Sequence, residues 1–210
     1  MFRRPLFARS TMRLFLTLDL FSVLAPRGRA DLSKGLLGYW PFDGDPSDHS
    51  GNGLDLTLHV DAGFGVGLIG EALDLNGWPD DFATREQNDP EFNFANEAFS
   101  AQVWVNFESP DREQTVLGKF TGGGGPGWTL TSLLGDGSRS AAHFWAGTGQ
   151  VALYSDDEGR CTLSPGVWNS FVVRHESDTF DLFLNGLLVA SQEFFGDIQQ
   201  TSEPLLIGTR

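Results

Sequence analysis

The sequence predicts an all-β fold, a two-sheet β-sandwich of the jelly-roll type, and three observations support this. Short segments of alternating polarity recur from about residue 37 onward, as half-buried strands require. Turn-forming glycine is abundant, with 26 among 210 residues, and 18 Phe and 6 Trp can fill a core between sheets. No segment has a sustained helical period. Short strands separated by glycine-rich turns favour a sandwich.

The clearest strand is predicted over Phe99–Phe107. Apolar residues occupy every second position of this segment, and the intervening positions are polar except for Trp104. A period of two places the apolar side chains on one face and leaves Trp104 among polar neighbours on the other.

The clearest hairpin is predicted around Asn185-Gly186, between strands at Phe180–Leu184 and Leu187–Ser191. Asn and Gly tolerate positive φ at both central positions, so the pair favours a type I′ turn. The other predicted strands are Leu37–Phe42, Asp55–Val60, Ala72–Leu75, Thr115–Phe120, Trp128–Leu133, Ala142–Ala146, Val151–Tyr154, Phe171–His175 and Pro204–Ile207. The polar residues 85–98 have room for one short helical turn.

Residues 1–30 are predicted to be a leader, and residues 31–210 form the sandwich. The leader holds 6 of the 14 basic residues and 1 of the 28 acidic ones. Its basic start, its apolar run Leu14–Leu24 and the small residues of Gly28-Arg29-Ala30 match a secretory signal. An Arg-rich organelle transit peptide is the alternative. We therefore expect a protein that is secreted or held at the cell surface.

The body of the chain is strongly acidic, since the formal charge of the whole chain is already −14 with the basic leader included. Nucleic-acid binding needs clustered Lys and Arg for phosphate contacts, so this class is excluded. The apolar run of the leader is too short to span a bilayer, and no later run is longer, so no membrane insertion is expected.

Several motifs resemble, in order, those of laminin-G-like domains in the concanavalin A-like lectin/glucanase superfamily. They are Gly38–Gly44 (GYWPFDG), Asp48–Gly53 (DHSGNG), Gly70–Gly77 (GEALDLNG), Phe99–Val105, Thr115–Lys119, Leu163–Trp168, Leu184–Gly186 and Pro204–Gly208. The resemblance covers about residues 36–208 and implies a concanavalin A-like sandwich. It also implies that Trp40 and Trp168 lie in the core.

The same resemblance implies one further strand after Gly208, where this sequence ends at Arg210. We therefore expect the sandwich to lack its final strand, which leaves backbone groups unpaired on the neighbouring strand. We predict that the neighbour is Leu37–Phe42, that the C-terminus is truncated, and that further domains follow downstream.

A structural calcium ion is predicted at a glycine-rich acidic loop, because clustered hard oxygen ligands suit Ca²⁺. The predicted ligands are Asp43, Asp45, Asp48 and Asn52. The alternative is that these residues only shape turns, for which Asp, Asn and Gly are the usual choice.

The predicted ligand-binding residues are Gln102, Trp104, Asn106 and Trp78. An aromatic platform beside polar groups is typical of a small-molecule or sugar site. The first three share the polar face of one strand, and Trp78 lies in a turn. Trp104 could instead belong to a second core layer.

No catalytic residues are predicted. Paired carboxylates at glycosidase spacing, a zinc-binding helix motif and a serine nucleophile elbow are all missing from the sequence. The single cysteine, Cys161, follows an acidic stretch, which disfavours a reactive thiolate. We predict a non-catalytic module that binds a polysaccharide or a glycoprotein glycan. The alternatives are a protein-interaction or adhesion module and a fragment of a glycoside hydrolase.

Overall fold

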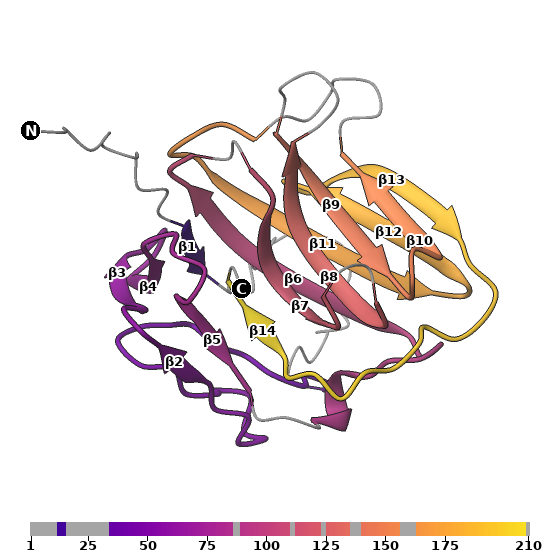
Figure 1. Cartoon of the computed structure of the whole chain (residues 1–210), viewed down its shortest axis with the longest axis horizontal. Helices are drawn as coiled ribbons and strands as arrows, with labels where there is room; N and C mark the ends of the chain where they lie inside the picture. Colours follow the sequence, from indigo (N-terminus) through magenta and orange to yellow (C-terminus); the bar gives the residue numbers. More distant parts are fainter. Residues whose placement is uncertain are drawn as a thin grey trace, which may run out of the picture.

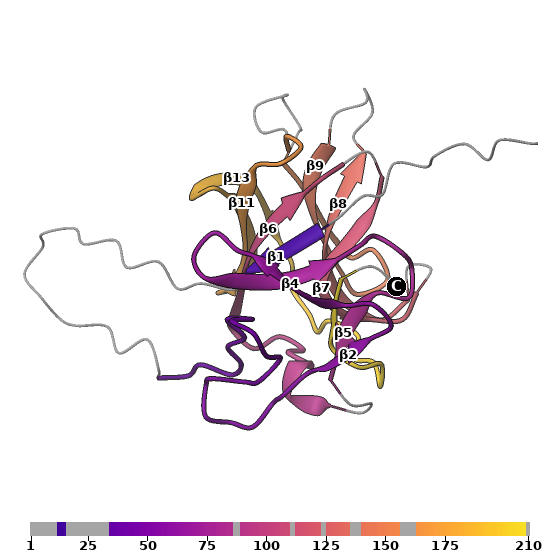
Figure 2. The same cartoon turned by 90° about the vertical axis from the view of Figure 1, so that its left-hand side faces the viewer.

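The computed structural model describes residues 12–15, 34–85, 89–109, 112–122, 125–134, 140–155 and 163–208. Within these ranges the chain forms two antiparallel sheets that pack face to face (Figure 1). In Figure 2 the strands β6 and β11 lie on one side of the sandwich, and β8 and β9 lie on the other. The predicted two-sheet β-sandwich is confirmed.

Sheet A has seven strands, in the spatial order β13 (Leu187–Glu193), β12 (Thr179–Leu184), β11 (Trp168–Glu176), β6 (Phe99–Phe107), β1 (Met12–Phe15), β4 (Glu71–Leu75) and β3 (Gly63–Val66). Sheet B also has seven, in the order β10 (Val151–Tyr154), β9 (Ser140–Ala146), β8 (Gly127–Leu134), β7 (Gln114–Phe120), β14 (Leu206–Ile207), β5 (Phe82–Thr84) and β2 (Thr57–His59). One 3₁₀ turn, η1 (Pro90–Phe92), falls in the segment where a helical turn was expected.

Aromatic rings from both sheets meet in the core. Phe144 of sheet B stacks against Phe180 of sheet A, with ring centroids 5.6 Å apart. Trp128 of β8 lies 5.9 Å from Phe99 of β6 by the same measure. Trp40 is 4% exposed, and its indole N–H donates to the carbonyl of Leu54 at 2.8 Å, so its predicted core position is confirmed. These large side chains hold the sheets together because each buries a large apolar area.

The predicted hairpin at Asn185-Gly186 is confirmed. Asn185 has φ of 52° and Gly186 has φ of 79°, so both central residues occupy the left-handed region that a type I′ turn requires. The Asn185 side chain also accepts a hydrogen bond from the backbone N–H of Ser170 at 2.9 Å. The turn is therefore fastened to the neighbouring strand β11.

The prediction of a strand at Leu37–Phe42 is wrong. The backbone groups of Tyr39 are used by the loop that follows: its N–H donates to Asp48 at 2.9 Å, and its carbonyl accepts from His49 N–H at 2.7 Å. Phe42 has φ of 57° and is 1% exposed, so the chain turns inward instead of continuing in extended form. The backbone of this segment therefore forms hydrogen bonds with the loop that follows it and not with a neighbouring strand.

Strand β1 lies inside the predicted leader. It pairs with β4 on one side and with β6 on the other. The remaining residues of the leader, and Cys161, lie outside the described residues.

Candidate functional site

The predicted ligand residues of β6 lie on the outer face of sheet A. Val103, Val105 and Phe107 alternate with them and are at most 1% exposed, so these three face the core. Strand geometry then places Gln102, Trp104 and Asn106 on the opposite face. All three are half-buried, which suits side chains on a partly covered outer face.

The neighbouring strand β11 adds a second tryptophan to this face. Directly opposite residues of antiparallel strands share a face, and Trp168 stands opposite Asn106. Trp168 is half-buried and lies outside the core cluster, so its predicted core position is wrong. Trp168 is the first residue of β11, and alternation with the buried residues Phe171 and Val173 puts it on the outer face.

We call this outer surface the tryptophan patch. It consists of Gln102, Trp104 and Asn106 on β6 and of Trp168, Ser170 and Val172 on β11. Trp104 and Trp168 are diagonal neighbours within it, which puts their Cβ atoms about 7–8 Å apart or slightly less. Two indoles at that spacing, with amides and a hydroxyl between them, form an aromatic surface with polar groups at its margin.

The polar groups of the tryptophan patch are only partly used by the protein. The Gln102 amide donates to the Ser170 hydroxyl at 3.3 Å, and the Asn106 amide donates to the carbonyl of Gly166 at 3.3 Å. Both amide oxygens keep the capacity to accept. The indole N–H of Trp104 is shielded from solvent and has no acceptor among the described residues. A buried donor without an acceptor is costly to the fold.

Trp78, the fourth predicted ligand residue, lies apart from the tryptophan patch. It is 59% exposed on the loop that follows β4. Leu75 at the end of β4 and Phe107 at the end of β6 both stand opposite Met12, so this loop lies at the same end of sheet A as Asn106. Trp78 is therefore placed to extend the patch along that end, but it is not part of it.

Asp48, a predicted calcium ligand, uses both carboxylate oxygens to hold its own loop. Oδ1 accepts from the backbone N–H groups of Tyr39 and Ser50 at 2.9 and 2.8 Å, and Oδ2 accepts from Leu54 N–H at 3.0 Å and from the Ser50 hydroxyl at 2.7 Å. Burial alone would raise the pKa of Asp48, but the hydrogen bonds from Leu54, Tyr39 and Ser50 outweigh it and lower the pKa.

The other three predicted calcium ligands also have contacts within the protein. Asp43 accepts from the N–H of Glu71 at 3.0 Å, and Asp45 accepts from the N–H of Ser47 at 2.8 Å. The Asn52 amide donates to the carbonyls of Leu36 and Leu37 at 2.9 and 2.8 Å. In the described part of the chain, no group of three or more His, Cys, Asp and Glu side chains is placed to hold a metal ion. The contacts fit the turn-shaping alternative.

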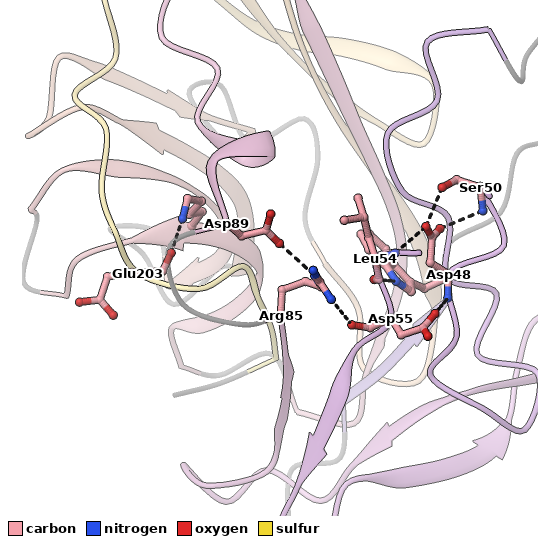
Figure 3. A network of polar contacts seen from close by, with 9 residues as sticks. Asp48, Ser50, Leu54, Asp55, Arg85, Asp89 and Glu203 are labelled. Atoms are coloured by element: carbon pink, nitrogen blue, oxygen red, sulfur yellow. Dashed lines mark hydrogen bonds and ion pairs between the residues drawn. The ribbon is translucent and has the colours of Figure 1, made fainter. Parts of the chain in front are cut away.

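A polar network continues from this loop toward sheet B (Figure 3). The N–H of Asp48 donates to Asp55 at 2.8 Å, and Arg85 donates to the carbonyl of Asp55 at 2.9 Å. Arg85 also donates from Nε to Asp89 at 2.9 Å, and the Asp89 side chain is only 4% exposed. Beyond it, Lys119 is fully buried, and burial lowers the pKa of its ammonium group. This network is structural, because its charges are directed at protein groups.

Sheet B has its own group of polar and aromatic side chains on its outer face, which the sequence analysis did not identify. The face carries Thr129, Thr131, His143, Trp145 and Tyr154. Thr131 and His143 are hydrogen bonded at 3.1 Å, and both are under 9% exposed. The sequence signal that could have identified this face is the alternation along Ser140–Ala146, where His143 and Trp145 alternate with small or aromatic core residues. Close packing makes this face a structural layer.

Three further acidic residues of the described chain lie in turns. Asp80 and Asp81 lie in the turn between β4 and β5, where Asp81 is 1% exposed and accepts from the N–H of Asp61 at 3.0 Å. Glu91 lies in the 3₁₀ turn η1. The stretch 156–158 falls outside the described residues.

Two face-to-face antiparallel sheets with a core of cross-sheet aromatic pairs define a β-sandwich. The chain belongs to the Laminin_G_3 family of the concanavalin A-like lectin/glucanases superfamily, whose model matches residues 83–210. The expected superfamily and fold are confirmed. A search of the curated proteins finds no match.

Two solved structures share the fold at low sequence identity. The binding domain of Paraclostridial Mosquitocidal Protein 1 has a TM-score of 0.59 and 16% identity; the match covers 77% of this chain and 41% of that one. Domain 4 of AbnA, an extracellular arabinanase from Geobacillus stearothermophilus, was determined in complex with arabinotriose. It has a TM-score of 0.58 and 16% identity, and the match covers 79% of each chain. In the described part of the present chain, no helix is long and apolar enough to cross a membrane.

Proposed function

We propose that the chain is a non-catalytic module that binds a polysaccharide or a glycoprotein glycan, and that the tryptophan patch is its binding surface. One observation carries this proposal: Trp104 and Trp168 lie as diagonal neighbours on the outer face of one sheet. A sugar ring offers an apolar face that stacks on indoles and hydroxyls that pair with nearby amides.

The amides on either side of Trp104 support the same ligand class. Gln102 and Asn106 each keep an amide oxygen that can accept from a sugar hydroxyl. Arg174 stands opposite Ser100 on the neighbouring strand and pairs with Asp181 at 2.6 Å, so its charge is directed at a protein group. The complex of the AbnA domain with arabinotriose shows that a sandwich of this class can hold an oligosaccharide.

The test is a glycan array probed with the full chain, followed by titration of the strongest binder. Trp104→Ala and Trp168→Ala should each weaken binding at least about tenfold, as truncation of an aromatic anchor does. Trp145→Ala is the matched control, because Trp145 is a half-buried tryptophan on the outer face of the other sheet. An unchanged affinity in both patch variants would refute the proposal.

Two other outcomes favour the alternatives. Specific binding to proteins without glycans, lost in the same patch variants, would favour an adhesion module. Release of reducing ends from polysaccharides would favour a hydrolase fragment. The proposal also includes export by the leader at residues 1–30, which N-terminal sequencing of the secreted product would test.

Calcium binding by Asp43, Asp45, Asp48 and Asn52 stays a prediction from the sequence. Glycan titration in calcium and in EDTA decides whether the ion takes part. Equal affinities in the two buffers would contradict calcium-assisted binding.

A further inference from the structure

Strand β1 is the link between two parts of sheet A. Met12 stands opposite Leu75 of β4 and Phe107 of β6, and Leu14 stands opposite Leu73 and Val105. The pairings described for β6 are with β1 and β11 only. The β3–β4 hairpin therefore joins the rest of the sheet through four residues from the start of the chain.

The place that β1 fills is a slot one strand wide. Neighbouring strands lie about 4.8 Å apart, so β4 and β6 stand about 10 Å from each other. The four residues that stand opposite Met12 and Leu14 are at most 1% exposed: Leu73, Leu75, Val105 and Phe107. An empty slot would leave backbone N–H and C=O groups unpaired on both neighbours, beside this part of the core.

No hairpin ties β1 to either neighbour. Its partners begin at Glu71 and Phe99, far along the chain, so β1 can leave the sheet without unfolding another strand. It also pairs with only four of the nine residues of β6. A short strand with purely non-local contacts is among the elements that open at low free-energy cost.

The sequence of β1 suits its neighbours. Apolar Met12 and Leu14 stand opposite the buried apolar residues Leu73, Leu75, Val105 and Phe107, and basic Arg13 stands opposite Asp74 and Asn106. The acidic body, with most of the 28 Asp and Glu residues, favours a basic strand at this place. The occupant is thus a short extended segment, Met-Arg-Leu-Phe, with one basic residue among three apolar ones.

We propose that the slot between β4 and β6 is a strand-acceptor site, that its occupant is this chain's own segment of residues 12–15, and that the occupant exchanges with the same sequence supplied as a separate peptide. Removal of the leader opens the slot to an added strand, as in recognition by β-strand addition. This inference is independent of glycan binding.

The first test places a specific protease sequence at residues 25–30 of the full chain and cuts the chain after it has folded. A fluorescent peptide of residues 8–19 is then added. The cut protein should take up this peptide, and the uncut protein should take up at least tenfold less, because the tethered segment competes at high effective concentration. The same peptide with Leu14→Pro should not bind, since proline cannot donate within a central strand. Absence of uptake after the leader fragment has been released would overturn the proposal.

The second test needs no cut and measures backbone hydrogen exchange in the full chain. Leu14→Pro should reduce amide protection at Leu73–Leu75 and Val105–Phe107, and it should leave the pairing of β11 with β12 protected. Leu20→Pro, which lies in the leader outside β1, is the control variant. Equal protection in both proline variants would show that residues 12–15 do not complete the sheet.

Discussion

His143 on β9 stacks against Tyr154 on β10, with ring centroids 4.4 Å apart and an angle of 13° between the ring planes. The Nδ1 atom of His143 is hydrogen bonded to Thr131, and its Nε2 atom is buried without a partner in the described structure. Burial lowers the pKa of His143 from 6.5 to about 4. The folded state therefore holds this imidazole neutral.

This arrangement predicts a pH dependence of stability. The contribution of His143 is fully present above pH 6.5, the pKa in the unfolded chain, and is lost as the pH falls through 4. The free energy of unfolding should fall over that range by at most about 1.4 kcal/mol per pH unit from this group. Urea denaturation across pH 4–7 measures it. His143→Asn should flatten the slope, whereas His49→Asn at an exposed position should not. An equal slope in wild type and His143→Asn contradicts the prediction.

A second prediction concerns Arg85. Replacement by Ala leaves the carboxylate of Asp89 buried without its cation, and it also removes the hydrogen bond to the carbonyl of Asp55. Breaking one side of a buried ion pair costs about 3–5 kcal/mol. Chemical denaturation measures the loss, with Arg112→Ala at an exposed position as the control, for which we expect less than about 1 kcal/mol. Similar losses of unfolding free energy in the two variants would show that the contacts of Arg85 with Asp89 and Asp55 do not stabilise the fold more than an exposed arginine does.

A third prediction separates turn shaping from metal binding at Asp48. Asp48→Asn puts an amide where one carboxylate oxygen now accepts from Leu54 and Ser50. Removing these bonds while their donors stay in place should cost about 1–3 kcal/mol, equally in EDTA and in calcium. Thermal melting in the two buffers measures this. A loss seen only in calcium would identify Asp48 as a metal ligand instead.

A fourth prediction tests the hairpin turn. Gly186 has φ of 79°, and a Cβ built on it meets no atom within 4 Å. Gly186→Ala should therefore cost about 1–2 kcal/mol through backbone conformation alone. Gly186→Asn should cost less, because Asn tolerates the left-handed region. Equal costs in the two variants would contradict a cost that arises from the left-handed backbone conformation.

Much of the fold could be predicted from the sequence, because alternation and turn residues are local signals. The strands β6 and β10 have the predicted bounds, and the Asn185 turn has the predicted conformation. Leu37–Phe42 shows the limit of these signals. It has a strand-like composition, but its backbone groups pair with the following loop through Asp48 and His49.

The candidate site could be predicted only in part. Alternation within one strand placed Gln102, Trp104 and Asn106 on a shared face. The contribution of Trp168 depends on the register between β6 and β11, which are far apart in sequence. Similarly, β1 could not be predicted as a strand of the sheet, because only its pairing with β4 and β6 distinguishes it from an apolar leader.

Glycan binding at the tryptophan patch can be tested by one comparison between the two sheets. Isothermal titration of the strongest array binder into wild type, Trp104→Ala, Trp168→Ala and Trp145→Ala compares the two outer faces. The two patch variants should lose at least about tenfold in affinity, and Trp145→Ala should keep wild-type affinity. Wild-type affinity in the patch variants, with loss confined to Trp145→Ala, would contradict binding at the tryptophan patch and place the site on sheet B.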